Sequence, residues 1–536
     1  MTRPEPDPRP PAGTGDAAKP VRRLTSNILF AVVSWVVPTL AAVIAVPITV
    51  RGLGDDGYGI VALVGAVSGY LAITQAGFGS AIIRFVSMFV TRGEGRAIRE
   101  CLREVLSWFS AAGVIGGTAM WFLAPWLVNS VLKVPSALTG QAIDAFRIGG
   151  FTFAAGALVA PLSLLPNAFL RYDLVAGLQS GVAVASLAGP ALLVTFGFGL
   201  IPVMWFGAAL NVIAAVIYAV VGARLVRTVP KQGESFSRHR RGFASFVMTE
   251  ATNQVWSMIQ SQTNKTLVGV AGGTSQVAYF QVSTTVADRS NGLLNNMARV
   301  LLPTVAQLTA GGDHGGLAAL YERSTRLLFL LNASITGAVV VFSAPLLGSW
   351  IAPRYAAEGG TALSLLMLAQ LVGSMSQVGG NVNLALGKPK INLAFSVINS
   401  IVNLSTVYWL TAAYGITGTA LSVLLAAFVM PTFVHYTNRN VIHIASWPMF
   451  RDCYLRTALL TTAVAAAAWL LLRPLASTLL VTVGLIGVTT IVGLLLGAAV
   501  GVADPTDRAS IVAMLRRVVP GGRSRDAGPG GDGDER

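Results

Sequence analysis

Long apolar runs are the feature that most constrains how this chain folds. Runs of about 20 hydrophobic residues, long enough to cross a bilayer as a helix, recur along most of its 536 residues. Only 11% of the residues are charged, whereas a soluble chain carries about 25%. We therefore predict an all-α polytopic membrane protein with about fourteen transmembrane helices. The predicted spans are 25–50, 58–86, 104–128, 143–168, 174–198, 201–224, 243–270, 276–306, 326–351, 361–386, 391–412, 416–437, 455–472 and 478–501.

Basic residues are unevenly distributed between the two sets of loops that alternate along these spans. If the N-terminus is inside, the outer loops hold only four basic residues, and the inner segments hold the rest. This asymmetry follows the positive-inside rule and predicts a multi-pass protein with both termini cytoplasmic. It also explains the formal charge of +15 without a nucleic-acid partner. The four outer basic residues are Arg51, Lys133, Arg354 and Arg473.

A basic linker divides the spans into six before it and eight after it. The segments 167–187 and 383–404 resemble each other, since each has a polar break at an inner loop and then an apolar helix. Internal repeats are frequent in secondary transporters. We predict two parallel six-helix lobes around a central cavity, followed by two C-terminal helices. The predicted division is a disordered cytoplasmic tail (1–24), an N-lobe (25–228), a cytoplasmic linker (229–242), a C-lobe (243–440), the last two helices (441–503) and a second cytoplasmic tail (504–536).

The cysteines and histidines form no pattern that would hold a metal. Cys101 and Cys453 each begin an apolar run, and the four histidines are scattered. Neither set has the spacing of a metal site or of a disulfide framework. We predict two inert cysteines, no metal and no cofactor.

The seventh and eighth spans break the apolar pattern. Their ionisable and amide side chains fall on one face of each helix at about 100° per residue. Such groups are costly at membrane depth and need partners. A water-filled transport cavity and an internal salt-bridge network both explain them, and the two can coexist. The candidates are Glu250, Asn253, Ser257, Asn264 and Lys265, then Asp288, Asn291, Asn295 and Arg299, with Arg289 off the polar line.

The first two spans are less polar, with Gln75 and Arg84 as candidates. Arg84 lies near the inner end of its span, so it either faces the cavity or reaches the lipid headgroups. Neither span carries a carboxylate, whereas a cation-driven drug antiporter is expected to keep acidic residues deep in the membrane. The basic balance favours an anionic substrate such as a phosphate.

A basic face precedes the third span. Arg96, Arg99 and Arg103 are spaced at i, i+3 and i+7, which places them on one side of a helix. This pattern predicts a cytoplasmic surface helix that contacts anionic lipid headgroups.

Four motifs point to a known family. They are RGLGDDGYGIVAL at 51–63, GFGSAIIRFVS at 77–87, LLPNAFLRYDL at 164–174 and QTNKTLVGVAGGTSQVAYFQVS at 262–283. Their order and spacing resemble the polysaccharide-transporter branch of the multidrug/oligosaccharidyl-lipid/polysaccharide exporter superfamily, the Wzx-like flippases. The resemblance covers residues 25–440. Within it, Gly54, Gly57 and Tyr58 are expected to be turn and lobe-packing residues.

The resemblance implies a function as well as a fold. It implies flipping of an undecaprenyl-diphosphate-linked oligosaccharide from the inner to the outer leaflet of the bacterial cytoplasmic membrane by alternating access. Lys265, Asp288, Arg289, Arg299 and Arg84 become candidates for holding the diphosphate or the glycan. The expected partners are this lipid-linked substrate, membrane lipids, and the polymerase and chain-length machinery of cell-surface polysaccharide biosynthesis, and the protein is expected to be a monomer and not an enzyme.

Two other functions remain open. A multidrug cation antiporter would share the fold, although the first two spans lack the acidic residue that it needs. A polytopic glycosyltransferase or polymerase could use Asp55 and Asp56 of the first outer loop as an acidic pair, but that loop, RGLGDDG, is short for an active site.

Overall fold

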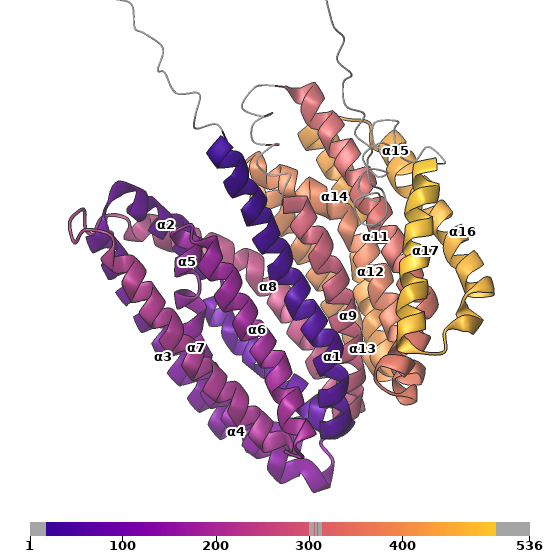
Figure 1. Cartoon of the computed structure of the whole chain (residues 1–536), viewed down its shortest axis with the longest axis horizontal. Helices are drawn as coiled ribbons and strands as arrows, with labels where there is room; N and C mark the ends of the chain where they lie inside the picture. The colour runs from indigo at the N-terminus through magenta and orange to yellow at the C-terminus, as the bar shows by residue number, and fades with distance from the viewer. Residues whose placement is uncertain (1–17, 300–304, 306–307, 309–312, 500–536) are drawn as a thin grey trace, which may run out of the picture. The chain divides into compact units, whose positions relative to one another are not determined.

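A computed structural model of the chain describes residues 18–299, 305, 308 and 313–499. All regular elements among these residues are helices (Figure 1). Of the two predicted tails, 1–17 and 504–536 lie outside the described residues, and α1 begins at Ala18. The described helices of eight or more residues are α1 (Ala18–Leu71), α2 (Phe78–Arg92), α3 (Gly95–Trp126), α4 (Thr139–Leu162), α6 (Tyr172–Thr195), α7 (Leu200–Arg227), α8 (Arg240–Gly272), α9 (Thr274–Arg299), α11 (His314–Trp350), α12 (Pro353–Ala385), α13 (Pro389–Ala427), α14 (Met430–Thr437), α16 (Arg456–Leu471) and α17 (Leu479–Ala499).

Short helical turns join several of these helices. The shorter α-helices are α5 (Leu165–Ala168) and α15 (Ser446–Met449). Single 3-10 turns are η1 (Ala72–Gln75), η3 (Ser136–Leu138), η4 (Phe236–Arg238) and η7 (Arg473–Leu475), and π-helical turns are η2 (Leu127–Val131), η5 (Asn438–Ile442) and η6 (Phe450–Leu455).

The helices coincide with the predicted spans. Ten described segments are long and apolar enough to cross a membrane. One of them, Pro389–Ile442, contains two predicted spans, and another, Val37–Gln75, overlaps the first two, 25–50 and 58–86. The second of these is broken at Ala76 and Gly77, between η1 and α2. The seventh and eighth spans coincide with α8 and α9, which are not among the ten. The all-α membrane fold is therefore confirmed, and the segments are consistent with about fourteen crossings.

Two of the predicted loops are breaks inside a helix instead. The helical assignment of α1 continues through 51–57, and its backbone leaves the helical conformation only at Gly54, where φ is 71°. In α13 the same happens at Gly415, where φ is 57°. A residue without a Cβ adopts positive φ at little cost, so one glycine can separate two helices without a loop.

The chain forms two compact units, and both are discontinuous in sequence. Unit 1 comprises Met1–Arg289, Leu347–Leu366 and Lys390–Val429, and unit 2 comprises Ser290–Leu346, Met367–Pro389 and Met430–Arg536. The predicted lobes are continuous in sequence and divided at 229–242, so they are not the same as these two units. They stay a prediction.

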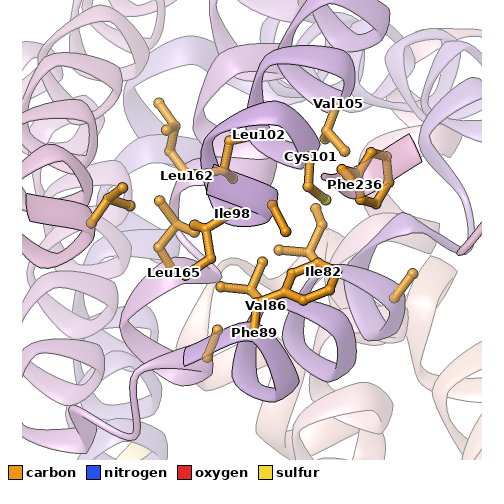
Figure 2. Packing of buried hydrophobic residues seen from close by; sticks show 14 of the residues in the cluster. Ile82, Val86, Phe89, Ile98, Cys101, Leu102, Val105, Leu162, Leu165 and Phe236 are labelled. Carbon is orange, nitrogen blue, oxygen red and sulfur yellow. The ribbon is translucent and has the colours of Figure 1, made fainter. Parts of the chain in front are cut away.

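An apolar cluster joins the first helices of unit 1 (Figure 2). Ile82, Val86 and Phe89 of α2 are spaced at i, i+4 and i+7, which is the period of a buried helix face. They pack with α3 residues around Ile98, and Phe236 of η4 enters the same cluster fully buried. The predicted cytoplasmic linker, 229–242, therefore contributes Phe236 to the core of unit 1.

Glycines allow α3 and α4 to approach closely. A Cβ on Gly117 would lie 2.6 Å from the Gly150 carbonyl oxygen, and a Cβ on Gly150 would lie 2.5 Å from the Gly117 oxygen. Small residues at a helix crossing let two backbones pack by van der Waals contact, which is the main attraction between helices in lipid.

Unit 2 combines an apolar contact with a buried polar one. Phe342 of α11 is fully buried in a cluster with Ala468 of α16. The Tyr321 hydroxyl donates to Asn438 Oδ1 at 2.9 Å, and both side chains are buried. Each polar group thus has the partner that burial requires.

Candidate functional site

Helix α8 carries five of the candidate residues, and three hydrogen bonds fix it within unit 1. The Tyr70 hydroxyl of α1 donates to Thr263 Oγ1 at 3.0 Å. The Gly77 backbone N–H donates to Gln254 Oε1 at 3.2 Å. The Ser400 hydroxyl of α13 donates to Gln260 Oε1 at 3.3 Å. Polar residues of α8 thus contact both the predicted N-lobe, through Tyr70 and Gly77, and the predicted C-lobe, through Ser400. None of these contacts uses a candidate residue.

Lys133 caps the C-terminus of α8. Its ammonium group donates to the Ala271 carbonyl at 2.9 Å, and its backbone N–H donates to the Gly269 carbonyl at 3.4 Å. Carbonyls in the last turn of a helix have no partner within the helix, and a cation there also interacts favourably with the helix dipole. Gly273, at a φ of 85°, then turns the chain into α9.

One face of α8 is accessible. Gln254, Ser257 and Ser261 are exposed and spaced by three and four residues, so they lie on one side of the helix. Glu250 lies one turn earlier and is half-buried. Asn264 lies at the far end of this face; it is buried, and its Oδ1 has no hydrogen-bond partner among the described residues.

Charges on α8 and α9 interact. The half-buried Lys265 ammonium and the exposed Asp288 carboxylate attract each other, and Arg289 also attracts Asp288. A compensated pair tolerates a low-dielectric setting better than either charge alone. Two cations around one carboxylate leave a positive balance, which suits an anionic ligand.

Arg84 and Gln75 lie against α8. The Arg84 guanidinium of α2 is exposed and stands 4.8 Å from the Phe246 ring, a cation–π contact one helical turn before Glu250. Gln75 ends η1, directly before the backbone that contacts Gln254, and its Nε2 is buried without a hydrogen-bond partner among the described residues.

The remaining candidates lie in unit 2 or have side chains that the structure does not describe. Asn291 belongs to unit 2, where its Oδ1 accepts from the Gln377 amide at 2.7 Å. The side chains of Asn253, Asn295 and Arg299 lie outside the described residues. The predicted cavity lining therefore stays a prediction as a whole.

A second polar group lies in unit 1 where the helix breaks at Gly54. Asp55 accepts hydrogen bonds from the Tyr279 and Tyr355 hydroxyls, both at 3.0 Å, and forms an ion pair with Arg354 at 2.8 Å. Its side chain is only 11% exposed. These four residues, with Asp56 bonded to the Thr274 hydroxyl, form what we call the Asp55 network. It joins α1, α9 and α12.

Both aspartates of the first predicted outer loop are thus engaged in this network. Sequence reasoning considered them only as an acidic pair for an enzyme. An acidic pair for catalysis needs carboxylates free to exchange protons with a substrate, and Asp55 already has three donors. The partners are 224 and 300 residues away in sequence, so no local signal revealed them.

Sequence reasoning also overlooked two charges in the fourth predicted span. Asp144 and Arg147 of α4 form an ion pair at 3.6 Å, and the Arg147 guanidinium stands 5.3 Å from the Trp121 ring of α3. The N-terminal half of the chain therefore does contain a carboxylate within a span. Their spacing of three residues, typical of a helical ion pair, was the available signal.

No other arrangement in the described residues suggests a metal or a reactive thiol. Among them, no group of three or more His, Cys, Asp or Glu side chains could hold a metal ion. Cys101 and Cys453 are both buried free thiols, and Cys101 belongs to the apolar cluster of unit 1.

Comparison with known proteins gives one family and several relatives. Residues 48–357 match the family described as "Polysaccharide biosynthesis protein". A "Putative O-antigen transporter" of Shigella flexneri is 22% identical over 404 residues, which cover 74% of this chain and 94% of that protein.

Two solved structures share the fold. The first is "Lipid II flippase MurJ, inward closed conformation", with a TM-score of 0.66 and 13% identity, covering 87% of this chain and 98% of that one. The second is an inward-facing multidrug resistance MATE family transporter of the MOP superfamily, with a TM-score of 0.58 and 14% identity, covering 79% and 99%. At these identities the likeness concerns the fold alone.

Proposed function

The chain belongs to the family of polysaccharide biosynthesis proteins, in the polysaccharide-transporter branch of its superfamily, and from this premise we propose that it is a lipid flippase. Its substrate is an undecaprenyl-diphosphate-linked oligosaccharide. The protein moves this substrate from the inner to the outer leaflet of the bacterial cytoplasmic membrane by alternating access. Completed units then supply the synthesis of a cell-surface polysaccharide.

The observation that carries the proposal is the charged pair of helices α8 and α9. They coincide with predicted spans but carry Lys265, Asp288 and Arg289. Charges within membrane-spanning helices are costly and are kept where they serve a pathway. The O-antigen transporter of Shigella flexneri, whose name describes the same task, supports this interpretation.

Each charged residue has a distinct role in this proposal. Lys265 and Arg289 bind the diphosphate, an anion that suits an ammonium and a guanidinium group. Asp288 holds the two cations when the site is empty and releases them to the substrate. The exposed amide and hydroxyl groups of Gln254 and Ser257 contact the glycan.

The Asp55 network closes the outer end of this pathway. The predicted topology places Gly54 and the turn between α8 and α9 on the outer side of the membrane. A network that ties α1, α9 and α12 together there holds this end shut, which leaves substrate access from the cytoplasmic side.

A multidrug antiporter is the second candidate, and one observation favours it. Asp144 supplies the carboxylate that the first two spans lack, and the MATE transporters have the same fold. However, Asp144 is 59% exposed and already paired with Arg147, so it is a poor proton or cation carrier.

Deletion of the gene followed by analysis of membrane lipids tests the function. A flippase mutant accumulates completed lipid-linked oligosaccharide on the cytoplasmic leaflet. A glycosyltransferase mutant would accumulate a truncated lipid-linked oligosaccharide, and a polymerase mutant would accumulate completed units that are exported but not polymerised. An antiporter mutant would become drug-sensitive and would have normal glycans. Any of the last three results contradicts the proposal.

Single substitutions then test the site. We expect Lys265→Ala, Asp288→Ala and Arg289→Ala each to impair export while the amount of folded protein stays near that of the wild type. Lys265→Arg keeps the charge and should retain most activity. Lys388→Ala, in an exposed turn, removes the same charge elsewhere and is the matched control. Normal export in all three alanine variants would refute the assignment.

Flippase activity also sets the expected partners. The polymerase and the chain-length machinery use the product, and the protein acts as a monomer with both termini in the cytoplasm. Crosslinking in membranes, with the polymerase gene deleted as a control, tests the first of these contacts.

A further inference from the structure

Two apolar grooves of unit 1 lie on either side of α3. The first groove, of about 850 Å³, lies between α3, the break around η1, and α8. Trp108 and Phe243 line it together with Val247. The second groove, of about 880 Å³, lies between α3, α4 and α7, and Leu162 and Ala219 are among its lining residues. Both volumes are in the range of about 300–1,000 Å³ that small-molecule sites have.

Two residues of α3, Arg103 and Ser107, line both grooves. They are one helical turn apart, so they form the ridge between the grooves. Arg103 is exposed, and its guanidinium has no hydrogen-bond or ion-pair partner among the described residues. A cation therefore stands where the two apolar grooves meet.

The neighbouring charges are already engaged. Arg96 pairs with Glu100 at 2.8 Å. Arg99 donates to the carbonyls of Val226 and Val229, at 3.2 and 3.1 Å, and so caps the end of α7. The basic face seen in the sequence thus divides into two structural arginines and one that remains available.

The carboxylate nearest to Arg103 in sequence does not cancel its charge. Glu104 forms an ion pair with Arg240 of α8 at 3.1 Å. Because that pair is neutral overall, the ridge keeps the positive charge of Arg103.

Arg103 also lies at the depth of lipid phosphates. It is 23 residues before Trp126 in α3, or about 34 Å along the helix at a rise of about 1.5 Å per residue. Trp126 is 57% exposed, as is usual for a tryptophan at a membrane interface. The hydrocarbon core is about 30 Å thick, so a helix with Trp126 at one interface places Arg103 at the other.

We propose that α3 carries a binding site for one anionic diacyl phospholipid of the inner leaflet. The phosphate binds Arg103, and one acyl chain occupies each groove. Two chains diverging from one headgroup match two grooves diverging from one cation. The inner leaflet is rich in anionic lipids, which supplies the charge complementarity.

This site is independent of the proposed substrate pathway. A single-chain polyprenyl carrier would fill one groove and leave the other empty, so the paired grooves favour a diacyl lipid. The first groove is lined in part by α8, but neither groove contains a candidate residue of α8 or α9, and the site does not depend on the transported molecule.

Native mass spectrometry of the full-length protein tests the proposal. The protein in detergent is titrated with dioleoyl phosphatidylglycerol or dioleoyl phosphatidylcholine, and the Kd of the first bound lipid is measured. We expect wild type to prefer phosphatidylglycerol. Arg103→Gln should weaken its binding about fivefold, the change that corresponds to about 1 kcal/mol for one basic residue near an anionic lipid. Arg103→Lys should restore most of the binding.

Matched variants distinguish lipid binding at this site from a general electrostatic attraction between the basic protein and anionic lipids. Arg96→Gln removes the same charge from the same helix outside both grooves and should leave binding unchanged. Ala219→Leu fills the second groove and should weaken the binding of phosphatidylglycerol, whereas Val220→Leu, on the exposed adjacent position, should not.

Three results would overturn the proposal. One is an equal loss of binding in Arg103→Gln and Arg96→Gln. Another is equal affinity of the wild type for the two phospholipids. The third is displacement of phosphatidylglycerol by an equimolar amount of undecaprenyl monophosphate, which would assign the grooves to a polyprenyl chain.

Discussion

Removal of the Asp55 carboxylate should open the predicted outer end of unit 1. Asp55 accepts from two tyrosines and pairs with Arg354, and its side chain is 11% exposed. A hydrogen bond to a charged group contributes about 1.5–3 kcal/mol, so the two tyrosine bonds together contribute about 3–6 kcal/mol. Arg354 is 54% exposed, and a pair of that kind adds at most about 1 kcal/mol.

These values predict an order of effects among three variants. If the network exists only in the closed state, its loss shifts the equilibrium toward the open state by the same free energy. At about 1.4 kcal/mol per factor of ten, Asp55→Ala shifts the ratio by about 100-fold to 10,000-fold. In Asp55→Asn the amide oxygen still accepts from the tyrosines, so this variant should shift the ratio of open to closed states less. Arg354→Ala should shift that ratio less than about tenfold.

Labelling of a single introduced cysteine measures this shift. Ser261→Cys places a thiol on the accessible face of α8, and both native cysteines are buried. A membrane-impermeant maleimide added outside spheroplasts should label Ser261→Cys slowly in the wild-type background and much faster with Asp55→Ala. Equal labelling in the two backgrounds, or an Arg354→Ala effect as large as that of Asp55→Ala, would refute the reasoning.

Two further predictions concern stability and are checked by thermal unfolding of the purified protein. Gly117→Val places a side chain against the Gly150 carbonyl and should destabilise the protein by about 1–3 kcal/mol. Gly140→Ala is the control, because a Cβ at Gly140 would have no atom within 4 Å and should not destabilise it. Equal unfolding temperatures of the two variants would contradict the close crossing of α3 and α4. Phe236→Ala should lower the free energy of unfolding by about 3–5 kcal/mol because the ring is fully buried. Phe122→Ala, at a side chain that is 75% exposed, should lower it far less. A mild effect of Phe236→Ala would mean that the linker does not belong to the core.

Hydropathy predicted the helices because a membrane span must be apolar over about 20 residues. The gaps between the predicted spans located the breaks at Gly54 and Gly415, but they did not predict that the helical assignment continues on both sides of a single glycine. A glycine at positive φ changes the direction of the chain within one residue, and hydropathy carries no information on backbone φ.

The candidate site was only partly visible in the sequence. Lys265 and Asp288 stood out because a charge in an apolar stretch needs a reason. Asp55 stood out as a charge too, but its meaning depends on Tyr279 and Tyr355. Those partners come from distant helices and have no period that links them to Asp55, so only the folded chain reveals the network.

The four basic residues of the predicted outer loops show why exceptions to a charge rule are informative. Arg51 donates to the Trp350 and Ile351 carbonyls at the end of α11, Lys133 does the same for α8, and Arg354 pairs with Asp55. Arg473 stands 5.6 Å from the Trp469 ring.

Each of these residues therefore has a partner, and three of them complete helix ends or the Asp55 network. A basic residue on the unfavoured side of a membrane is retained when the fold needs its charge. The inner side needs no such reason, because cations there are favoured in any case. An inner arginine without a partner among the described residues, such as Arg103, consequently keeps its charge available for a lipid.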